Sequence, residues 1–331
     1  MFALESWILY LLTFISSTIL LRGFYHSKFF SHLDVPNHRS MHDYPTKKSA
    51  GLVFMGLFMI SLFYVQIYSK DGSFSLLSQT LPGLMVCLLI GFLDDRYNFS
   101  SRRKLFFEIL FFIPYVYLFF PDYQVFGFTL PLPHIVFSIV LAGYIIFVTN
   151  LCNFMDGLDL YLSLSILSSI GIYFSILHPN PNQAITVLLL VTSILSFLYF
   201  NFPPARLFMG DTGSLPLGYM VAILPFLNGN EIPDLSYGFL LIPVFWIDGV
   251  FTILIRLKKK ENIFRAHREH LYQKITLQKL DKRFTTFIFS LWNLLTIPVY
   301  FFLKDSIPLM GIISIILFLN GFLYTILIRK L

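Results

Sequence analysis

Residues that can bind cations and phosphate gather in five short segments of an otherwise apolar chain. The segments are Asp34 to Gly51, Gly91 to Lys104, Asn150 to Asp159, Asn201 to Ser214 and Arg256 to Arg283. Carboxylate and amide oxygens suit a hard divalent cation, and basic side chains suit phosphate groups. If the segments meet at one face of the protein, they could bring a soluble charged molecule to a charged group held in a membrane.

Two adjacent carboxylates, Asp94 and Asp95, end the third apolar run in the sequence FLDDR. They repel each other and lose hydration at a membrane boundary, so a cation or a basic partner is needed to compensate them. A helix end held at the lipid headgroups by an Asp/Arg pair would explain the same residues. The recurrence of similar groups in the other segments favours a binding site.

The segment NLCNFMDGLD carries Asn150, Asn153, Asp156 and Asp159 between two apolar runs. These oxygen donors suit Mg²⁺, which takes one or two protein ligands and leaves the rest of its shell to substrate phosphates and water. Asn and Asp also cap helices, and capping by Asp156 or Asp159 is the alternative interpretation.

Glycines flank Asp211 in the sequence FMGDTGS, directly before another apolar run. Glycine lets a backbone approach a ligand closely, and the free N–H groups of a helix N-terminus suit phosphate. A plain turn followed by a helix cap would look similar.

Histidine and arginine alternate in the last polar segment, at His267, Arg268 and His270. Such side chains can clamp a pyrophosphate, arginine as a two-pronged donor and histidine as a donor or an acid. The nearby run Lys258 to Lys260 is explained by a basic loop on the cytoplasmic side and is assigned no chemistry.

The composition indicates what holds these segments. Hydrophobic residues make up 56% of the 331 residues, charged residues only 13%, and phenylalanine occurs 39 times, which is typical of an integral membrane protein. A spanning helix needs about 20 mostly apolar residues, so the apolar runs predict an all-α, polytopic protein with about eleven transmembrane helices. The runs are approximately 4–25, 50–68, 80–93, 105–120, 134–150, 160–177, 184–200, 213–228, 236–256, 284–303 and 307–327. The third and eighth are short enough to be tilted or partly re-entrant.

Basic residues predict the orientation, because Lys and Arg near span ends stay in the cytoplasm. With eleven spans, all 24 Lys and Arg residues except Lys70 and Lys304 fall on one side. The N-terminus is therefore predicted outside and the C-terminus inside, with the active-site face toward the cytoplasm. The expected cytoplasmic loops are about 26–49, 94–104, 151–159, 201–212 and 257–283.

The same map interprets the remaining features of the chain. The net charge of +6 reflects membrane topology and does not indicate nucleic-acid binding. Cys87 and Cys152 lie at or inside the membrane, so no disulfide framework is expected. No long linker divides the chain, and residues 1–331 are predicted to form a single membrane domain.

Five motifs, in this order and on one predicted membrane side, give the chain a family resemblance. FLDDR, NFMDGLD, FMGDTGS, the HRxHLY-like string from His267 to Tyr272 and the DxPNxRSxHxxPT stretch from Asp34 to Thr46 resemble the polyprenyl-phosphate N-acetylhexosamine-1-phosphate transferase superfamily, glycosyltransferase family 4. Within it the chain is most similar to the bacterial undecaprenyl-phosphate sugar-1-phosphate transferases that initiate O-antigen and related surface glycans.

The resemblance implies a reaction in the bacterial inner membrane. The phosphate of undecaprenyl phosphate would attack the β-phosphorus of a UDP-N-acetylhexosamine, giving a lipid diphosphate sugar and UMP. By motif position, Asn153 and Asp211 would hold Mg²⁺, which Mn²⁺ could replace, together with the diphosphate. Asp94 and Asp95 would be catalytic, activating or positioning the lipid phosphate. The resemblance is also compatible with a homodimer.

The resemblance further implies six substrate-binding residues. Lys104 matches a basic residue near the aspartate pair. Asp156 and Asp159 match positions near the nucleotide-sugar pocket, and the two histidines and the arginine of the last polar segment match a phosphate-contacting loop. The six are Lys104, Asp156, Asp159, His267, Arg268 and His270.

Three departures from the family pattern concern the shape of the site. The third acidic residue of a DDxxD pattern is Asn98, which cannot supply a second charge. A glycine-rich turn is replaced by Lys47 to Gly51, which argues against a close backbone approach there. A small glycine is replaced by Leu160. In the last loop, single histidines replace the run of adjacent histidines found in the muramyl-pentapeptide branch, which argues against that substrate.

Two other classes of function are weighed against the transferase. Intramembrane acids and glycine-broken helices are compatible with a secondary transporter of an anion, although the loops expected outside carry few acids. A catalytically inactive scaffold for glycan assembly is the third hypothesis. Asp248, inside the ninth run, is expected to be hydrogen-bonded within the protein and to fix helix packing, rather than to support the sugar site.

Overall fold

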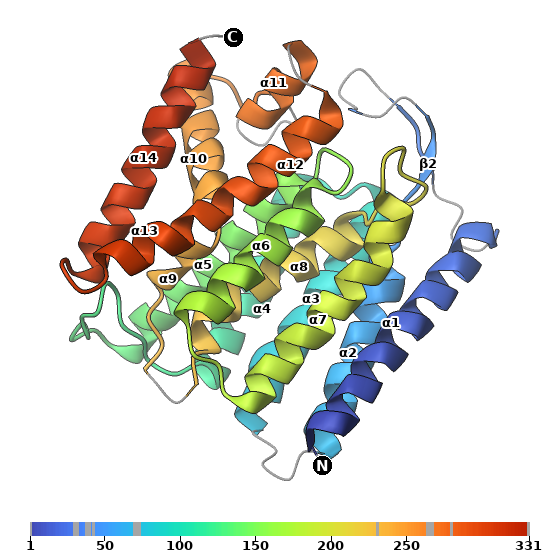
Figure 1. The fold of residues 1–331 in the computed structure, drawn as a ribbon, viewed down its shortest axis with the longest axis horizontal. Helices are drawn as coiled ribbons and strands as arrows, with labels where there is room; N and C mark the ends of the chain where they lie inside the picture. Colours follow the sequence, from blue (N-terminus) through green and yellow to red (C-terminus); the bar gives the residue numbers. More distant parts are fainter. Residues whose placement is uncertain are drawn as a thin grey trace.

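The computed structural model describes residues 2–28, 33–36, 41, 44–68, 74–229, 232–262, 268–278 and 281–329. They form a bundle of helices with a short antiparallel pair of strands, β1 (Leu33–Asp34) and β2 (Thr46–Lys47) (Figure 1). The α-helices are α1 (Phe2–His26), α2 (Gly51–Tyr68), α3 (Phe74–Tyr97), α4 (Ser101–Phe119), α5 (His134–Met155), α6 (Tyr161–Ile176), α7 (Pro181–Asn201), α8 (Asp211–Ile223), α9 (Tyr237–Leu241), α10 (Pro243–Lys258), α11 (Leu271–Gln278), α12 (Lys282–Trp292), α13 (Thr296–Leu303) and α14 (Leu309–Arg329). Short 3₁₀ turns follow α8 (Leu224–Phe226) and join α12 to α13 (Asn293–Leu295).

Every predicted apolar run lies in helical segments, but these segments differ in length. Six helical stretches of the described chain are long and apolar enough to cross a membrane, namely Trp7–His26, Leu76–Tyr97, His134–Met155, Pro181–Asn201, Lys282–Leu303 and Leu309–Arg329. The ninth run divides into α9 and α10 because Pro243 lacks an N–H group and begins a new helix. A polytopic all-α membrane protein is thus confirmed, whereas eleven spans are not.

The eighth run forms the short helix at the centre of the bundle. With 13 residues, α8 is about 20 Å long, well short of the roughly 30 Å hydrocarbon core. Every residue from Thr212 to Ile223 is buried, and α8 packs against α2, α3 and α5. The third run, in contrast, belongs to the 24-residue helix α3. Of the two runs expected to be short, only the eighth is.

Glycines at the helix contacts let α8 lie this deep. A Cβ atom added at Gly91 of α3 would lie 2.3 Å from the carbonyl oxygen of Asp211, and one at Gly218 of α8 would lie 2.8 Å from the Cα atom of Thr149 in α5. Small residues at such contacts allow backbones to approach closely. The start of α8 is therefore pressed against the last turns of α3 and α5.

The start of α1 and the end of α14 lie at opposite ends of the bundle (Figure 1). The strand β2, helix α11 and the first turn of α12 lie at the end where α14 finishes. The side of a membrane on which each terminus lies, and the cytoplasmic assignment of the α14 end, stay predictions. Cys87 and Cys152 are both buried and are not joined in a disulfide.

The contact between α2 and α8 can be tested with two glycines of the same helix. A Cβ atom at Gly51 would lie 2.1 Å from the backbone nitrogen of Gly213, whereas one at Gly56 would meet nothing within 4 Å. We expect Gly51→Ala to destabilise the protein by about 1–3 kcal/mol through overpacking, and Gly56→Ala to be neutral or to stabilise by up to about 1 kcal/mol. Thermal unfolding in detergent measures both, and equal melting temperatures for the two variants would contradict the packing.

Candidate active site

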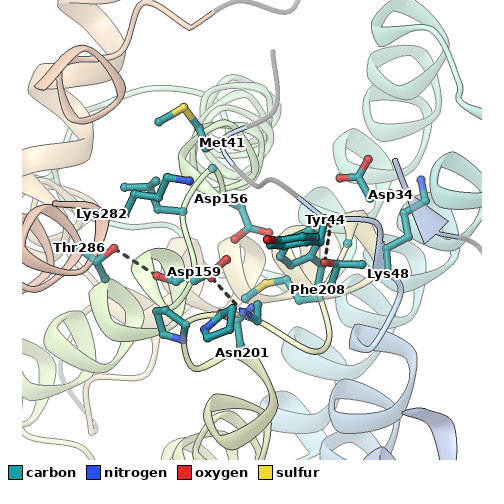
Figure 2. Close-up of a pocket in the computed structure, with 18 of the residues that line it drawn as sticks. Asp34, Met41, Tyr44, Lys48, Asp156, Asp159, Asn201, Phe208, Lys282 and Thr286 are labelled. Carbon is teal, nitrogen blue, oxygen red and sulfur yellow. Dashed lines mark hydrogen bonds between the residues drawn. The ribbon is translucent and has the colours of Figure 1, made fainter. Parts of the chain in front are cut away.

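All five polar segments contribute to one cavity of about 610 Å³ at the end of the bundle where α3, α5 and α7 finish and α8 and α12 begin (Figure 2). This volume is in the range of small-molecule sites. Helix ends meet here because each apolar run ends at a polar segment. The convergence expected from the sequence is therefore present in the folded chain.

Asp211, the first residue of α8, is the centre of a charged cluster. Its Oδ2 atom accepts hydrogen bonds from Nζ of Lys104 at 2.7 Å and from Nδ2 of Asn153 at 3.0 Å. The same Nζ atom lies 3.3 Å from Oδ2 of Asp94. Helices α3, α4, α5 and α8 thus each supply one member. The two residues proposed as metal ligands, Asn153 and Asp211, are in contact.

Asp95 has a different environment from its neighbour in the pair. It is 5% exposed, and its oxygens accept hydrogen bonds from the backbone N–H groups of Asp211 and Thr212, each at 3.2 Å. The hydroxyls of Thr212 and Ser49 donate to its Oδ2 atom as well. A helix leaves its first N–H groups unpaired, and Asp95 pairs two of them. Its carboxylate therefore fixes the start of α8.

Asp94 faces the cluster on the side of α4. Its Oδ2 atom contacts Lys104, and its Oδ1 atom is buried without a hydrogen-bond partner among the described residues. Asp94 and Lys104 lie behind Asp211 and are not part of the cavity wall. One ammonium group is thus shared by two carboxylates.

Asp156 and Asp159 line the cavity in the loop after α5. Burial raises the pKa of Asp156 to about 8, and the nearby carboxylates of Asp211, Asp159 and Asp95 add to the rise. Oδ2 of Asp159 accepts the backbone N–H of Ala205 at 3.1 Å, which joins this loop to the one after α7 (Figure 2). Asp159 thus has a clear structural role, while the raised pKa makes Asp156 sensitive to any cation bound nearby.

Among the described residues, acidic side chains outnumber basic ones around the cavity. The carboxyl groups that line it belong to Asp34, Asp95, Asp156, Asp159, Asp211 and Asp281, and the cations to Lys48, Lys282 and Arg283. Carboxylates in this excess repel a phosphate-bearing ligand unless a cation accompanies it.

The oxygens of Asp211 and Asn153 are the hard donors that Mg²⁺ prefers. A half-turn of the Asn153 amide would exchange its Nδ2 and Oδ1 atoms and present the oxygen. Within the described ranges no three His, Cys, Asp or Glu residues form a metal cluster. A cation held here would therefore use these two residues together with oxygens of its ligand, and the residues present fit such an ion.

The contact of the histidine loop with a phosphate, which the resemblance implied, stays a prediction. His267 lies outside the described residues, and neither Arg268 nor His270 lines the cavity. His270 is buried, with Nδ1 3.4 Å from Oδ1 of Asp248, and the same oxygen accepts the N–H of Leu271 at 2.9 Å. The buried carboxylate of Asp248 needs donors, and the loop supplies them. Asp248 thus has the internal hydrogen-bonded role expected of it.

Several cavity residues were not found from the sequence. They are Tyr44, Lys48, Asn201, Phe208, Gln273, Lys282, Arg283 and Thr286. The Thr286 hydroxyl donates to the carbonyl oxygen of Asp159 at 3.2 Å (Figure 2). Asn201 accepts the N–H of Leu160 and donates to the carbonyl of Leu207. All of these cavity residues except Thr286 lie within the five polar segments, which is the signal that the sequence carried for them.

The structure describes the backbone at the positions that depart from the family pattern. The sequence argued against a close backbone approach at the turn before α2. The structure has one there, because Gly51 packs against the backbone of Gly213. Ser49, Asn98 and Leu160 all have left-handed backbone angles, with φ of 71°, 50° and 66°. Asn98 suits the end of α3 because asparagine tolerates this conformation better than most residues.

The chain is similar to known proteins of one family. The family model described as "Glycosyl transferase family 4" matches residues 77–228. A probable undecaprenyl-phosphate N-acetylglucosaminyl 1-phosphate transferase of Bacillus subtilis is 28% identical over 276 residues, which cover 78% of this chain and 74% of the relative. A phospho-N-acetylmuramoyl-pentapeptide-transferase of Streptococcus gordonii is 30% identical over 242 residues, 68% of this chain and 71% of the relative. A protein of the same name from Fervidobacterium nodosum is 28% identical over 272 residues, which cover 77% of this chain and 82% of the relative.

The matched region contains the aspartate pair, Lys104, Asn153 and Asp211, which the structure gathers around one end of the bundle. The chain belongs to glycosyl transferase family 4, the polyprenyl-phosphate sugar-1-phosphate transferase superfamily, and is a membrane-embedded phosphoglycosyltransferase.

Proposed function

We propose that the protein transfers N-acetylhexosamine-1-phosphate from a UDP-sugar to undecaprenyl phosphate, giving undecaprenyl-diphosphate-sugar and UMP. The observation that carries the proposal is the Asp211 carboxylate, held by Asn153 and Lys104 at the edge of a cavity of suitable size. The names of the relatives supply the lipid acceptor and support a sugar-phosphate donor.

The reaction joins two phosphate-bearing molecules, so negative charge must be neutralised. Asn153 and Asp211 are proposed to hold Mg²⁺ or Mn²⁺, which would supply positive charge at the diphosphate. Lys104 keeps Asp211 ionised and oriented through its 2.7 Å contact. The excess of carboxylates around the cavity supports a cation requirement.

Asp94 and Asp95 are proposed to divide their work. Asp94, next to Lys104, is proposed to accept a proton or a hydrogen bond from the lipid phosphate through its Oδ1 atom, which is buried without a hydrogen-bond partner among the described residues. Asp95 acts through the backbone of Asp211, because its carboxylate accepts a hydrogen bond from the Asp211 N–H. We therefore assign catalysis to Asp94 and positioning to Asp95.

The pathway is proposed as the first membrane step of a bacterial surface glycan, such as O-antigen. The proposed setting is the inner membrane, with the cavity toward the cytoplasm, the N-terminus outside and a homodimer as the assembly to test. The N-acetylglucosaminyl name of the Bacillus subtilis relative favours a simple N-acetylhexosamine. A muramoyl-pentapeptide donor is the second candidate, because the relatives from Streptococcus gordonii and Fervidobacterium nodosum carry that name.

Reconstitution with undecaprenyl phosphate, Mg²⁺ and a panel of labelled UDP-sugars, including UDP-N-acetylglucosamine and UDP-N-acetylmuramoyl-pentapeptide, tests the proposal. We expect lipid-linked label and UMP with a simple N-acetylhexosamine donor. Label taken up unchanged by sealed vesicles would instead support transport. The absence of both product and uptake would support a scaffold. Product with the pentapeptide donor alone would select the second candidate.

The role of Asp211 predicts a loss of turnover without a loss of fold. We expect Asp211→Asn to lower kcat by about 10²–10³-fold, because a charge-stabilising group next to the diphosphate is lost. The melting temperature should stay close to that of the parent protein. Asp122→Asn is the matched control, since Asp122 is exposed and pairs with His134 away from the cavity. Normal turnover of Asp211→Asn at ordinary Mg²⁺ would refute the ligand role.

Because Asp94 and Asp95 are assigned different roles, we expect their variants to differ in stability. Asp95→Asn would turn an amide nitrogen toward N–H donors at the start of α8, so we expect a loss of about 1–3 kcal/mol in stability together with lower activity. Asp94→Asn should lower kcat with little change in melting temperature. Parallel measurement of kcat and thermal unfolding separates the two roles, and identical behaviour of both variants would disprove the division.

A further inference from the structure

Lys48 carries a positive charge on the cavity wall directly after β2. Its side chain is 21% exposed, and Nζ lies 3.7 Å from Oδ1 of Asp95. The same oxygen accepts the N–H of Asp211 at 3.2 Å. The Lys48 ammonium and the first N–H group of α8 thus flank one carboxylate oxygen, beside the residue that the proposed reaction depends on.

The turn that carries Lys48 is firmly held. The N–H of Phe208 donates to the carbonyl of Lys47 at 2.8 Å, and the N–H of Ala50 donates back to the carbonyl of Phe208 at 3.1 Å. Gly51 donates to the carbonyl of Met209 at 3.0 Å. A side chain on a rigid turn loses less freedom when it binds a ligand. The base of Lys48 is therefore set in position before any ligand arrives.

Asp95 does not need Lys48 to satisfy its oxygens. Two backbone N–H groups and two hydroxyls already donate to them. The Lys48 contact at 3.7 Å is longer than a hydrogen bond, and partly exposed ion pairs contribute little stability. Since an ammonium group has three donors, those of Lys48 stay available to a ligand in the cavity.

Lys48 and Lys104 approach Asp211 from different parts of the fold. Lys104, on α4, contacts the carboxylate, whereas Lys48, on the turn after β2, lies near the backbone nitrogen. The other cavity cations described, Lys282 and Arg283, belong to the first turn of α12. Lys48 is thus placed to contact an anionic group bound at Asp211 from the cavity side.

We propose that Lys48 binds the diphosphate of the nucleotide sugar and sets the affinity of the enzyme for its donor. This inference rests on the proposed function, because it takes a nucleoside diphosphate as the cavity ligand. It gives a role in this chain to a residue that stands where the resembling family has a glycine-rich turn.

Lys48→Met tests the proposal in the full-length protein in detergent with undecaprenyl phosphate and Mg²⁺. We expect about a tenfold rise in the KM for the UDP-sugar, the loss expected for one hydrogen bond to a charged group. The kcat, the KM for the lipid and the melting temperature should stay within experimental scatter. Calorimetric titration of UDP, which carries the diphosphate, in the presence of Mg²⁺ should show a similar rise in Kd without requiring turnover.

Two variants control the measurement. Lys48→Arg keeps the charge and should retain most of the donor affinity, whereas Lys259→Met removes an exposed lysine at the end of α10 and should change nothing. If Lys48→Met fails to purify, Lys48→Gln, which keeps a polar chain of similar length, carries the same comparison.

The possible failures are distinct. Unchanged donor KM and UDP Kd in Lys48→Met, with an active parent protein, would overturn the Lys48 inference and leave the transferase intact. A fall in kcat and melting temperature with an unchanged donor KM would also overturn it, because Lys48 would then act only on Asp95. An inactive parent with every UDP-sugar would instead refute the proposed function.

Discussion

The capping of α8 by Asp95 is the interaction on which the rest of the site depends. A helix buried along its whole length in apolar surroundings must pair its first N–H groups inside the protein. Asp95 accepts those of Asp211 and Thr212, so the start of α8 is tied to the last turn of α3. Because α8 is too short to span a membrane, its start lies within reach of the helix ends around it. The carboxylate of Asp211 then meets Lys104 of α4 and Asn153 of α5.

This arrangement concentrates negative charge where burial makes it costly. One ammonium, that of Lys104, serves both Asp94 and Asp211, and the pKa of Asp156 is raised to about 8. Groups shifted in this way cluster at functional sites, because such sites hold charges where burial disfavours them. The described cations of the cavity lie on the β2 and α12 sides, and the acidic cluster lies at α8.

The sequence predicted much of this architecture, and the limits of the prediction have physical causes. Apolar runs locate helices because burial in lipid requires them, and polar motifs at their ends converge because helix ends share a membrane face. The contact of Asn153 with Asp211 was expected from the family resemblance, which places both residues at one cation. The burial of His270 against Asp248 was not, because it depends on where α10 meets the following loop. The position of Lys48 likewise depends on backbone pairing between the turn and residues 208–209.

The three departures from the family pattern indicate that the site requires loop shape more than it requires glycine. Ser49 and Leu160 stand where glycines are usual, and both keep left-handed angles that cost a side-chain-bearing residue about 1–2 kcal/mol. Each has a compensating contact. The Ser49 hydroxyl donates to Asp95 at 2.9 Å, and the N–H of Leu160 donates to Asn201 at 2.7 Å while its side chain is buried. A chain that keeps the strained angles after losing the glycines is under constraint from the neighbouring residues, and at Ser49 that constraint comes from the carboxylate that also holds α8.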